Sequence, residues 1–202
     1  GSNIETTEKI NITRPITING NGHTMKYVGT FGKNASTDNT IWGGIYLLQI
    51  YTTEATIKDI ILTGGNAALL VNGSKVTFEG TIDVSGNGFG GIELGQGSGI
   101  TTIPHLKLVN GAKIVNTTES ENRPTLWVPE DTSSAILDIN GVTKTLTSGM
   151  ELTLNEIAEL FAIKENPDTS DSFIITILLG LSGLFMLLLN TKKGTKKIKK
   201  FV

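Results

Sequence analysis

Short alternations of apolar and polar residues fill the first three quarters of the chain, and glycine and asparagine separate one alternation from the next. A period of two is the pattern of a β-strand with one buried face. Residues 3–151 contain no helix-period stretch of useful length, so they are predicted to form an all-β outer domain. Twelve strands are expected, at Ile10–Thr13, Ile16–Asn19, Ile45–Ile50, Thr56–Thr63, Ala68–Val71, Val76–Val84, Gly91–Leu94, Leu106–Val109, Ala112–Asn116, Thr125–Val128, Ala135–Ile139 and Thr143–Thr147.

Turn signals divide these strands at an even step of about 22 residues. They are Gly20-Asn21-Gly22, Gly43-Gly44, Gly64-Gly65-Asn66, Gly86-Asn87-Gly88 and Asn110-Gly111. The segment Ile12–Asn21 aligns without gaps with Ile57–Asn66, at an offset of 45, and then with Phe78–Asn87, at a further offset of 21. The first offset is close to two repeat lengths, which predicts one more repeat between the two segments, disguised by Thr30–Asn39.

A repeat of this length without intervening helices is typical of a parallel β-helix, a solenoid in which each repeat makes one coil. Apolar side chains then point into the bore and stack on similar residues in the coils above and below. About five to six coils are expected. The alternative is an antiparallel sandwich with coincidental glycine spacing, whose strands would more often be joined by two-residue hairpins.

The stretch Ile10–Asn19 shows the alternation most clearly, and the chain is then expected to turn at Asn19-Gly20-Asn21-Gly22-His23-Thr24. This stretch is similar to the coils of the right-handed parallel β-helix in pectate-lyase-like proteins. The resemblance covers about residues 8–147 and implies the same fold. Bacterial surface proteins that carry such a domain before a wall anchor are a known class, so the resemblance also implies a place on a cell surface.

Three asparagines and one charged pair carry the most specific structural expectations. Asn21, Asn66 and Asn87 share one position in the alignments and are predicted to stack as a polar ladder at a corner of the coil. Lys58 and Glu79, one repeat apart, are predicted to form an ion pair of little energetic weight.

Residues 152–165 are expected to form a short amphipathic helix and a linker. Thr153-Leu154-Asn155-Glu156 has the form of a capping box, and apolar residues follow it at helical spacing. The open end of a solenoid exposes unpaired backbone and a cross-section of the core. The helix is therefore predicted to cover the last coil, and the alternative is that it lies on a membrane surface.

Residues 166–202 contain an apolar run, Phe173 to Leu189, that no charge interrupts between Ser172 and Thr191. A helix of that length spans roughly 30 Å, the thickness of a bilayer core. The run predicts a transmembrane helix over residues 173–190, and a buried core helix is the alternative because both are apolar. Its largest anchoring residues are Phe173, Leu178, Leu181, Phe185 and Leu189.

A basic tail, residues 192–200, follows the predicted helix. Its lysines are Lys192, Lys193, Lys196, Lys197, Lys199 and Lys200. Lysines at one end of an apolar helix tend to stay on the cytoplasmic side, so everything before Ser172 is expected to lie outside the cell.

A short proline–threonine motif, an apolar helix and a basic tail, in that order, resemble the cell-wall sorting signal of Gram-positive surface proteins. The motif residues are Asn166, Pro167, Asp168, Thr169 and Ser170. The resemblance implies that a sortase cysteine attacks the carbonyl of Thr169, cleaves the Thr169–Ser170 bond and passes the acyl group to an amine of peptidoglycan. The motif departs from the commonest pattern, which begins with Leu and ends with Gly. A permanent membrane anchor without this step is the alternative.

Composition narrows the classes of function. Cysteine is absent, so the sequence offers no disulfide and no thiolate chemistry. Before Ser172 there are 19 acidic and 11 basic residues, a net charge of −8, which argues against nucleic acid as a partner. The chain begins without a signal segment, so it is expected to be the C-terminal part of a longer precursor.

No acidic cluster, phosphate loop or metal motif is present, so no catalytic residue, metal site or cofactor is predicted. The expected function is cell-surface display or adhesion on a rigid stalk, with sortase, peptidoglycan and the membrane as partners and with glycans or host surface proteins as candidate ligands. The alternative is a polysaccharide lyase or hydrolase whose active coils lie in a missing N-terminal part. Trp42 and Trp127 are expected to be packed rather than to stack on sugars, and the loop Glu119–Pro124 is expected to protrude.

Overall fold

The computed structural model describes residues 1–29, 44–109 and 111–162, and almost all regular structure there is β-strand. The strands are β1 (Ile4–Thr6), β2 (Ile10–Ile12), β3 (Ile16–Tyr27), β4 (Tyr46–Tyr51), β5 (Glu54–Thr63), β6 (Ala67–Asn72), β7 (Lys75–Asp83), β8 (Gly90–Gly95), β9 (His105–Leu108), β10 (Lys113–Val115), β11 (Leu126–Trp127), β12 (Ser134–Ile139), β13 (Val142–Thr147) and β14 (Glu151–Leu152). A single helix is described, α1 (Leu154–Phe161). Each of the twelve expected runs overlaps one of these strands, so the all-β prediction for this part of the chain is confirmed.

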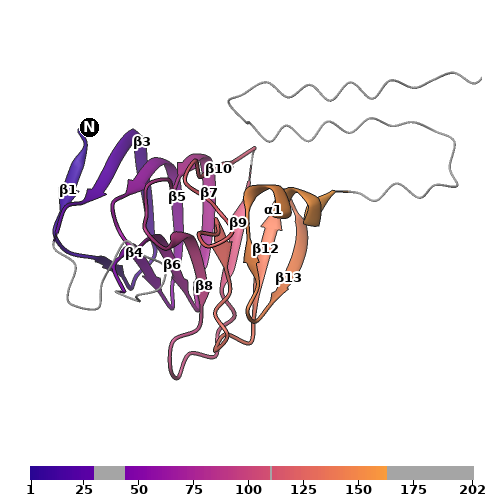
Figure 1. Cartoon of the computed structure of the whole chain (residues 1–202). Coiled ribbons are helices and arrows are strands. Elements are labelled where there is room, and N and C mark those ends of the chain that lie inside the picture. The colour runs from indigo at the N-terminus through magenta and orange to yellow at the C-terminus, as the bar shows by residue number, and fades with distance from the viewer. Residues whose placement is uncertain (30–43, 110, 163–202) are drawn as a thin grey trace, which may run out of the picture.

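From β1 to β9, successive strands alternate between two sheets, so that the chain winds from one sheet to the other and back (Figure 1). Sheet A has the order β1-β3-β5-β7-β9-β12-β13, with β10 also paired to β7. Sheet B has the order β14-β11-β8-β6-β4-β2. The pairs from β1 to β12 in sheet A and from β2 to β11 in sheet B are parallel.

The spacing between paired strands corrects one sequence alignment. Residues 54–58 of β5 pair with β7 at an offset of 21, as expected for Ile57 and Phe78. Ile12 and Ile18, however, pair with Ile50 and Ile57, at offsets of 38 and 39. The predicted offset of 45, with one more coil disguised between β3 and β5, is therefore wrong, because these two strands pair directly in sheet A. The alignment matched Ile12 with Ile57, whereas Ile12 lies in sheet B and Ile57 lies in sheet A.

The core lies between the two sheets and consists of columns of apolar side chains in register. Ile18, Ile57, Phe78 and Leu108 form one column across β3, β5, β7 and β9 of sheet A. A corresponding column in sheet B consists of Leu48, Leu69, Ile92 and Leu126. Burying one such side chain stabilises the folded state by about 1.5–3 kcal/mol. The columns therefore explain why apolar residues recur at alternate positions in these strands.

Strands β3, β5 and β7 each change register near their middle. Asn21, Asp59 and Gly80 have positive φ angles of 49°, 43° and 65° at these places. The Asp59 carboxylate accepts a hydrogen bond from the backbone N–H of Thr81 at 3.0 Å, which links β5 to β7. The turn expected at residues 19–24 is thus a bulge inside the long strand β3, because pairing with β5 resumes at His23.

The asparagine ladder exists with two of its three expected members. Asn66 and Asn87 are buried, and their side-chain oxygens accept hydrogen bonds from the N–H groups of Ile45 (3.2 Å) and Gly65 (2.9 Å). Both side chains therefore satisfy backbone groups one coil back along the chain. Asn21 is exposed in the bulge of β3 and does not belong to the ladder, because the alignment that placed it there was out of register.

At the C-terminal end both sheets finish with a reversed strand. β12 and β13 pair antiparallel through Asn140-Gly141, whose φ angles of 52° and 87° fit the two-residue turns that favour hairpins. β14 then pairs antiparallel with β11 at the edge of sheet B. The expectation of uniformly parallel coils is wrong here, although the Asn-Gly pair between two alternating runs was a visible hairpin signal.

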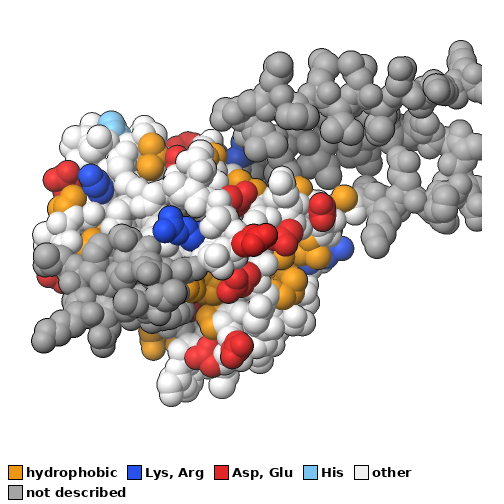
Figure 2. Space-filling model, viewed as in Figure 1, with side chains coloured by type: hydrophobic (Ala, Val, Ile, Leu, Met, Phe, Trp, Pro, Cys, Tyr) orange, Lys and Arg blue, Asp and Glu red, His pale blue; other side chains and the backbone are white. Residues whose placement is uncertain are grey.

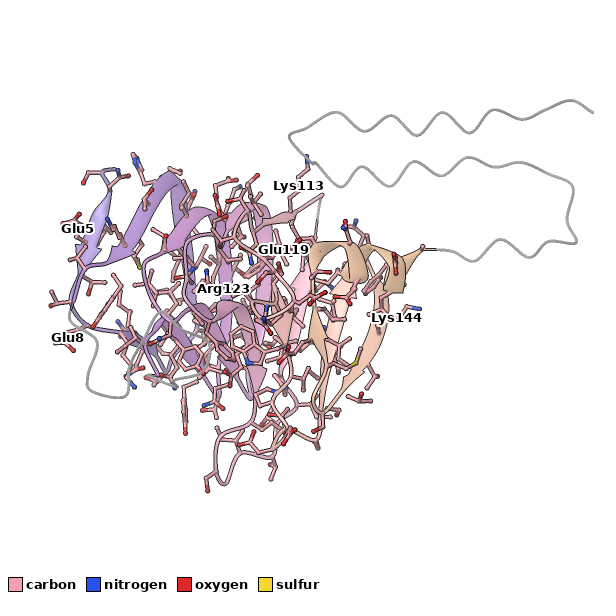
Figure 3. All side chains as sticks on the ribbon, viewed as in Figure 1. Glu5, Glu8, Lys113, Glu119, Arg123 and Lys144 are labelled. Atoms are coloured by element: carbon pink, nitrogen blue, oxygen red, sulfur yellow. The ribbon has the colours of Figure 1, made fainter. Side chains whose placement is uncertain are left out.

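Helix α1 packs over this reversed end, as the sequence predicted (Figure 1). The capping box is confirmed, since the side chains of Thr153 and Glu156 each accept a bond from the other residue's backbone N–H, at 3.3 and 2.8 Å. Ile157 is only 5% exposed and belongs to the main core. Lys144 of β13 lies 5.9 Å from the ring centre of Phe161 (Figure 3).

Glu119 connects the β10–β11 loop to the start of this helix (Figure 3). Its Oε2 accepts a hydrogen bond from the backbone N–H of Leu154 at 2.9 Å and from the hydroxyl of Thr125 at 2.5 Å. The loop expected to protrude is therefore fastened at its first residue, while Glu121, Asn122 and Arg123 remain exposed. A carboxylate at a helix N-terminus also complements the helix dipole.

Within the described ranges, no helix is long and apolar enough to cross a membrane. The predicted sorting motif, transmembrane helix and basic tail, residues 166–202, lie outside these ranges, as do Trp42 and the Thr30–Asn39 segment.

Candidate functional site

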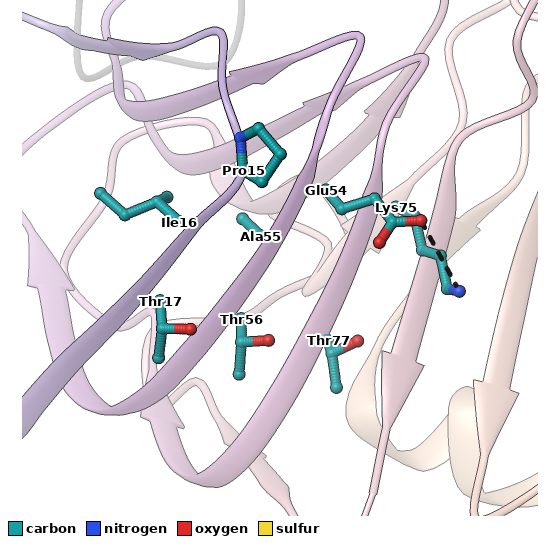
Figure 4. A pocket seen from close by; sticks show the side chains of 8 residues that line it. All are labelled: Pro15, Ile16, Thr17, Glu54, Ala55, Thr56, Lys75 and Thr77. Atoms are coloured by element: carbon teal, nitrogen blue, oxygen red, sulfur yellow. Dashed lines mark ion pairs between the residues drawn. The ribbon is translucent and has the colours of Figure 1, made fainter.

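A row of threonines crosses the outward face of sheet A (Figure 4). Thr17, Thr56 and Thr77 are Cα partners in β3, β5 and β7. Neighbouring parallel strands lie about 4.8 Å apart, so the three hydroxyls repeat at that step. Sheet register alone produces the row, because the residues on either side of each threonine point into the core.

Two ion pairs flank the threonines, and β5 supplies the acidic residue of one pair and the basic residue of the other. Glu54 and Lys75 lie 3.9 Å apart on one side, and Lys58 and Glu79 lie 3.8 Å apart on the other, as the sequence predicted for the second pair. All four side chains are more than a third exposed. Such exposed pairs contribute about 0–1 kcal/mol to stability, so a ligand could replace one of their contacts at small cost.

The polar face continues into β9 and β12. His105 is the partner of Lys75, and Lys107 of β9 lies 3.4 Å from Asp138 of β12. Desolvation lowers the pKa of His105, Lys75 and Lys107 lower it further, and Asp138 opposes them. The buried Nε2 atom of this imidazole has no hydrogen-bond partner among the described residues.

A shallow hollow of about 400 Å³ lies over the N-terminal part of this face. It is lined by Pro15, Ile16, Thr17, Glu54, Ala55, Thr56, Lys75 and Thr77, as Figure 4 shows. Hydroxyls, a carboxylate and an ammonium group converge there, which suits a ligand rich in hydroxyl or amide groups. Among the described residues, no three metal-binding side chains gather closely enough to hold an ion.

The outward face of sheet B is different, because it buries a carboxyl group. Leu70, Glu93 and Trp127 are register partners on β6, β8 and β11. The hydroxyl of Tyr46 donates a short hydrogen bond to Glu93 Oε2. Burial raises the pKa of Glu93 to about 7, and the nearby Asp131 adds to this, while the hydrogen bond from Tyr46 opposes it. Burial, followed by the charge of Glu93, also raises the pKa of Tyr46 above its ordinary range.

Trp127 belongs to this buried cluster and is only 3% exposed. Phe89 contacts its ring edge-on, with the ring centres 4.8 Å apart. The indole N–H of Trp127 lowers the pKa of the Glu93 carboxyl, although it forms no hydrogen bond of good geometry within the described part of the chain. The expectation that Trp127 is packed is confirmed, and it is not available to stack on a sugar.

Acidic side chains gather on the C-terminal part of the described chain (Figure 2). Residues 116–162 hold eight acidic and two basic residues, a net charge of −6, whereas residues 1–29 have a net charge of +1. The face of sheet A that carries the threonines therefore lies between a slightly basic end and a strongly acidic one.

The sequence analysis did not predict the threonine row or the buried carboxyl group of Glu93. Thr56 and Thr77 share the offset of 21 that the alignment found, but Thr17 joins them only at an offset of 39. Glu93 stands inside the apolar run 91–94, and that position was a signal of a buried carboxyl. The predicted processing and anchoring residues lie beyond the described part of the chain.

No family model matches the chain, and neither a curated protein nor a solved structure shows significant similarity to it.

Proposed function

We propose that this chain is a cell-surface display or adhesion protein whose outer domain is a right-handed parallel β-helix. Alternation of the chain between two sheets, with parallel register and stacked apolar columns, supports the solenoid. Right-handedness is expected because crossovers between parallel strands of one sheet almost always have that hand. Such a domain is stiff along its axis, since every coil is bonded to the next.

The binding surface in this proposal is the outward face of sheet A. The observation that carries it is the in-register row of Thr17, Thr56 and Thr77 between two exposed ion pairs of opposite sense. An extended polymer of sugars presents hydroxyl groups along its length and can bond to several such positions in succession. Glycans are therefore the ligand class proposed for this face.

The role is proposed to be binding rather than catalysis. Glu54, Glu79 and Asp138 each lie within 4 Å of a lysine from a neighbouring strand. Each of these carboxylates is thus engaged in an ion pair on the proposed binding face. Acid–base chemistry usually uses a carboxyl group with a pKa shifted toward neutrality. Glu93 has such a pKa, but it is buried and lies on sheet B, away from this face.

Attachment to the wall is proposed for the C-terminal segment, by resemblance to sorting signals. A sortase thiolate would attack the carbonyl carbon of Thr169, and the Thr169–Ser170 bond would break with release of the Ser170 amine. An amine of the peptidoglycan cross-bridge would then displace the thiolate and form an amide with Thr169. The segment 173–190 would hold the precursor in the membrane until transfer, with the six lysines of the tail in the cytoplasm.

Mass spectrometry of the mature protein from wall digests tests this attachment. The expected C-terminal peptide ends at Thr169 and carries a cross-bridge fragment, and a Thr169→Ala variant should lack it. A Ser170→Ala variant is the matched control, because the acyl residue is unchanged. An intact segment 170–202 in both the wild type and the Thr169→Ala variant would instead indicate a permanent membrane anchor.

A further inference from the structure

An ion pair and a row of hydroxyl groups bound the hollow on the outward face of sheet A (Figure 4). Glu54 and Lys75 are Cα partners at the first residues of β5 and β7, two positions before Thr56 and Thr77. Residues two apart in a strand share a face, so the ion pair and the hydroxyls lie roughly 7 Å apart on it. That separation is close to the width of one sugar ring, so a single sugar residue can contact both.

The Glu54–Lys75 pair keeps much of its hydrogen-bonding capacity for a ligand. Its Oε1 and Nζ atoms lie 3.9 Å apart, which is too far for a hydrogen bond. The Glu54 and Lys75 side chains are 72% and 48% exposed, so both charged ends are accessible from solvent. A ligand group that bridges them gains two charge-assisted hydrogen bonds, which are stronger than bonds between neutral groups.

Pro15 and Ala55 add an apolar surface beside the ion pair (Figure 4). Ala55 is 4% exposed, so its side chain forms the base of the hollow rather than its rim. A ligand group that fits there needs a donor, an acceptor and a methyl group close together. An acetamido group has all three, since its N–H donates, its carbonyl oxygen accepts and its methyl group is apolar.

The charge of the hollow also favours a neutral ligand. Among the described residues that line it, only Glu54 and Lys75 are charged, and their charges cancel. A sugar carboxylate would be attracted by Lys75 and repelled by Glu54, and an unacetylated amino sugar would meet the opposite arrangement. A neutral amide gives both side chains a partner and leaves no charge unpaired.

We infer that the outward face of sheet A selects glycans built from N-acetylated amino sugars. The inference rests on the proposed glycan-binding role and names the sugar class for it. The acetamido N–H donates to the Glu54 carboxylate, and the acetamido carbonyl accepts from the Lys75 ammonium group. The methyl group packs on Ala55, and hydroxyls of the same sugar ring bond to Thr56 and Thr77.

The second ion pair beside the threonines supplies a matched control. Lys58 and Glu79 are also exposed and lie 3.8 Å apart, but they do not line the hollow. Glu54→Ala and Glu79→Ala therefore remove the same kind of exposed carboxylate from the same sheet. Only the first of the two variants removes it from the hollow.

Isothermal titration calorimetry on the full chain, in a detergent without a sugar headgroup, tests this selection. The probes are tetrasaccharides of N-acetylglucosamine, of glucosamine and of glucose with the same linkage. The N-acetylglucosamine probe is expected to bind at least about tenfold more tightly than the glucose probe. Glu54→Ala and Lys75→Met should each reduce this preference to about twofold or less, whereas Glu79→Ala should leave it unchanged.

Thr56→Val should weaken the binding of every probe alike, because its hydroxyl does not contact the acetamido group. Circular dichroism identical to the wild type reports that the variants are folded. Equal affinities for the N-acetylglucosamine and glucose probes, or a preference that survives both Glu54→Ala and Lys75→Met, would overturn the inference and leave glycan binding standing. Binding of an oligogalacturonate but of none of the three probes would do the same. If none of the four ligands binds, the proposed function is wrong as well.

Discussion

The two ends of the sheet pair are built differently, although the same columns of apolar side chains run through both. At the C-terminal end, β13 and β14 reverse the chain in both sheets and α1 covers the core. At the N-terminal end, β1 pairs with residues 25–27 of β3, no described strand pairs with residues 16–19 on the side away from β5, and Ile16 is exposed. A parallel stack does not close itself, so closure has to be encoded by a separate device.

The C-terminal end is closed by α1, and three features of this helix contribute to stability by different amounts. Burial of Ile157 supplies the largest, the capping box of Thr153 and Glu156 is smaller, and Glu119 fixes where the helix begins. The predictions below test whether removing these parts makes the C-terminal end resemble the N-terminal one.

Truncating Ile157 is expected to have the largest effect. Ile157→Ala should lower the free energy of unfolding by about 2–5 kcal/mol, because it leaves a cavity under α1. Ile16→Ala, at the open end, should cost about 1 kcal/mol or less, since its side chain is already partly in water. Urea unfolding followed by circular dichroism measures both, and equal losses would contradict the contrast between the ends.

Glu93 lies on β8, between the two ends, and makes the free energy of unfolding depend on pH. Its pKa is raised to about 7 in the folded protein, above its ordinary value. The folded state therefore binds this proton more tightly than the unfolded state. The stabilisation that results is fully present below about pH 4.5 and is lost as the pH rises through 7. The loss is at most about 3 kcal/mol, by linkage of pKa to unfolding.

A Glu93→Gln variant should remove this pH dependence. Its free energy of unfolding should stay nearly constant between pH 5 and 8, where the wild type loses stability. Glu54→Gln, an exposed change on sheet A, is the matched control and should follow the wild type. Parallel curves for wild type and Glu93→Gln would show that this carboxyl does not titrate in the folded protein.

Loss of the N-cap is expected to be a smaller effect confined to the C-terminal end. Thr153→Ala removes the side chain that accepts the bond from Glu156 N–H and should cost about 1 kcal/mol. Thr145→Ala, on the exposed side of β13, is the control. Thermal unfolding distinguishes the two variants, and a similar loss in both would argue against a special role for the cap.

The weakest expected effect is an acid sensitivity of the cap. Hydrogen bonds from Thr153 lower the pKa of Glu156, so its stabilising charge is present above the ordinary pKa of a glutamate and is lost as the pH falls through its folded pKa. Amide exchange in α1 should accelerate in acid, while exchange at β1 should not change in this way. If acid changed amide exchange equally in α1 and in β1, the Glu156 carboxylate would have no special role in stabilising the helix.

The sequence predicted the strands well because most carry their own alternation of apolar and polar residues, while others, such as β6, are short apolar runs between glycine turns. It predicted the capping box from a local four-residue pattern and the Lys58–Glu79 pair from the offset of 21 between two aligned segments. It placed β3 out of register because β2 and β3 pair with their neighbours at offsets of 38–39 residues rather than 22, and local spacing does not reveal which distant strand is the neighbour. The bond from Glu119 to Leu154 joins residues 35 apart, so no local motif announces it.

The two-residue turn at Asn140-Gly141 also bears on how such a protein can change in length through evolution. Once β13 reverses the chain, duplication of a coil beyond it would meet an antiparallel edge and a helix rather than a matching strand. Duplication within the parallel part meets matching edges on both sides and keeps every column in register. Related chains are therefore expected to gain or lose coils before β12 and to retain the reversed end as a fixed terminus.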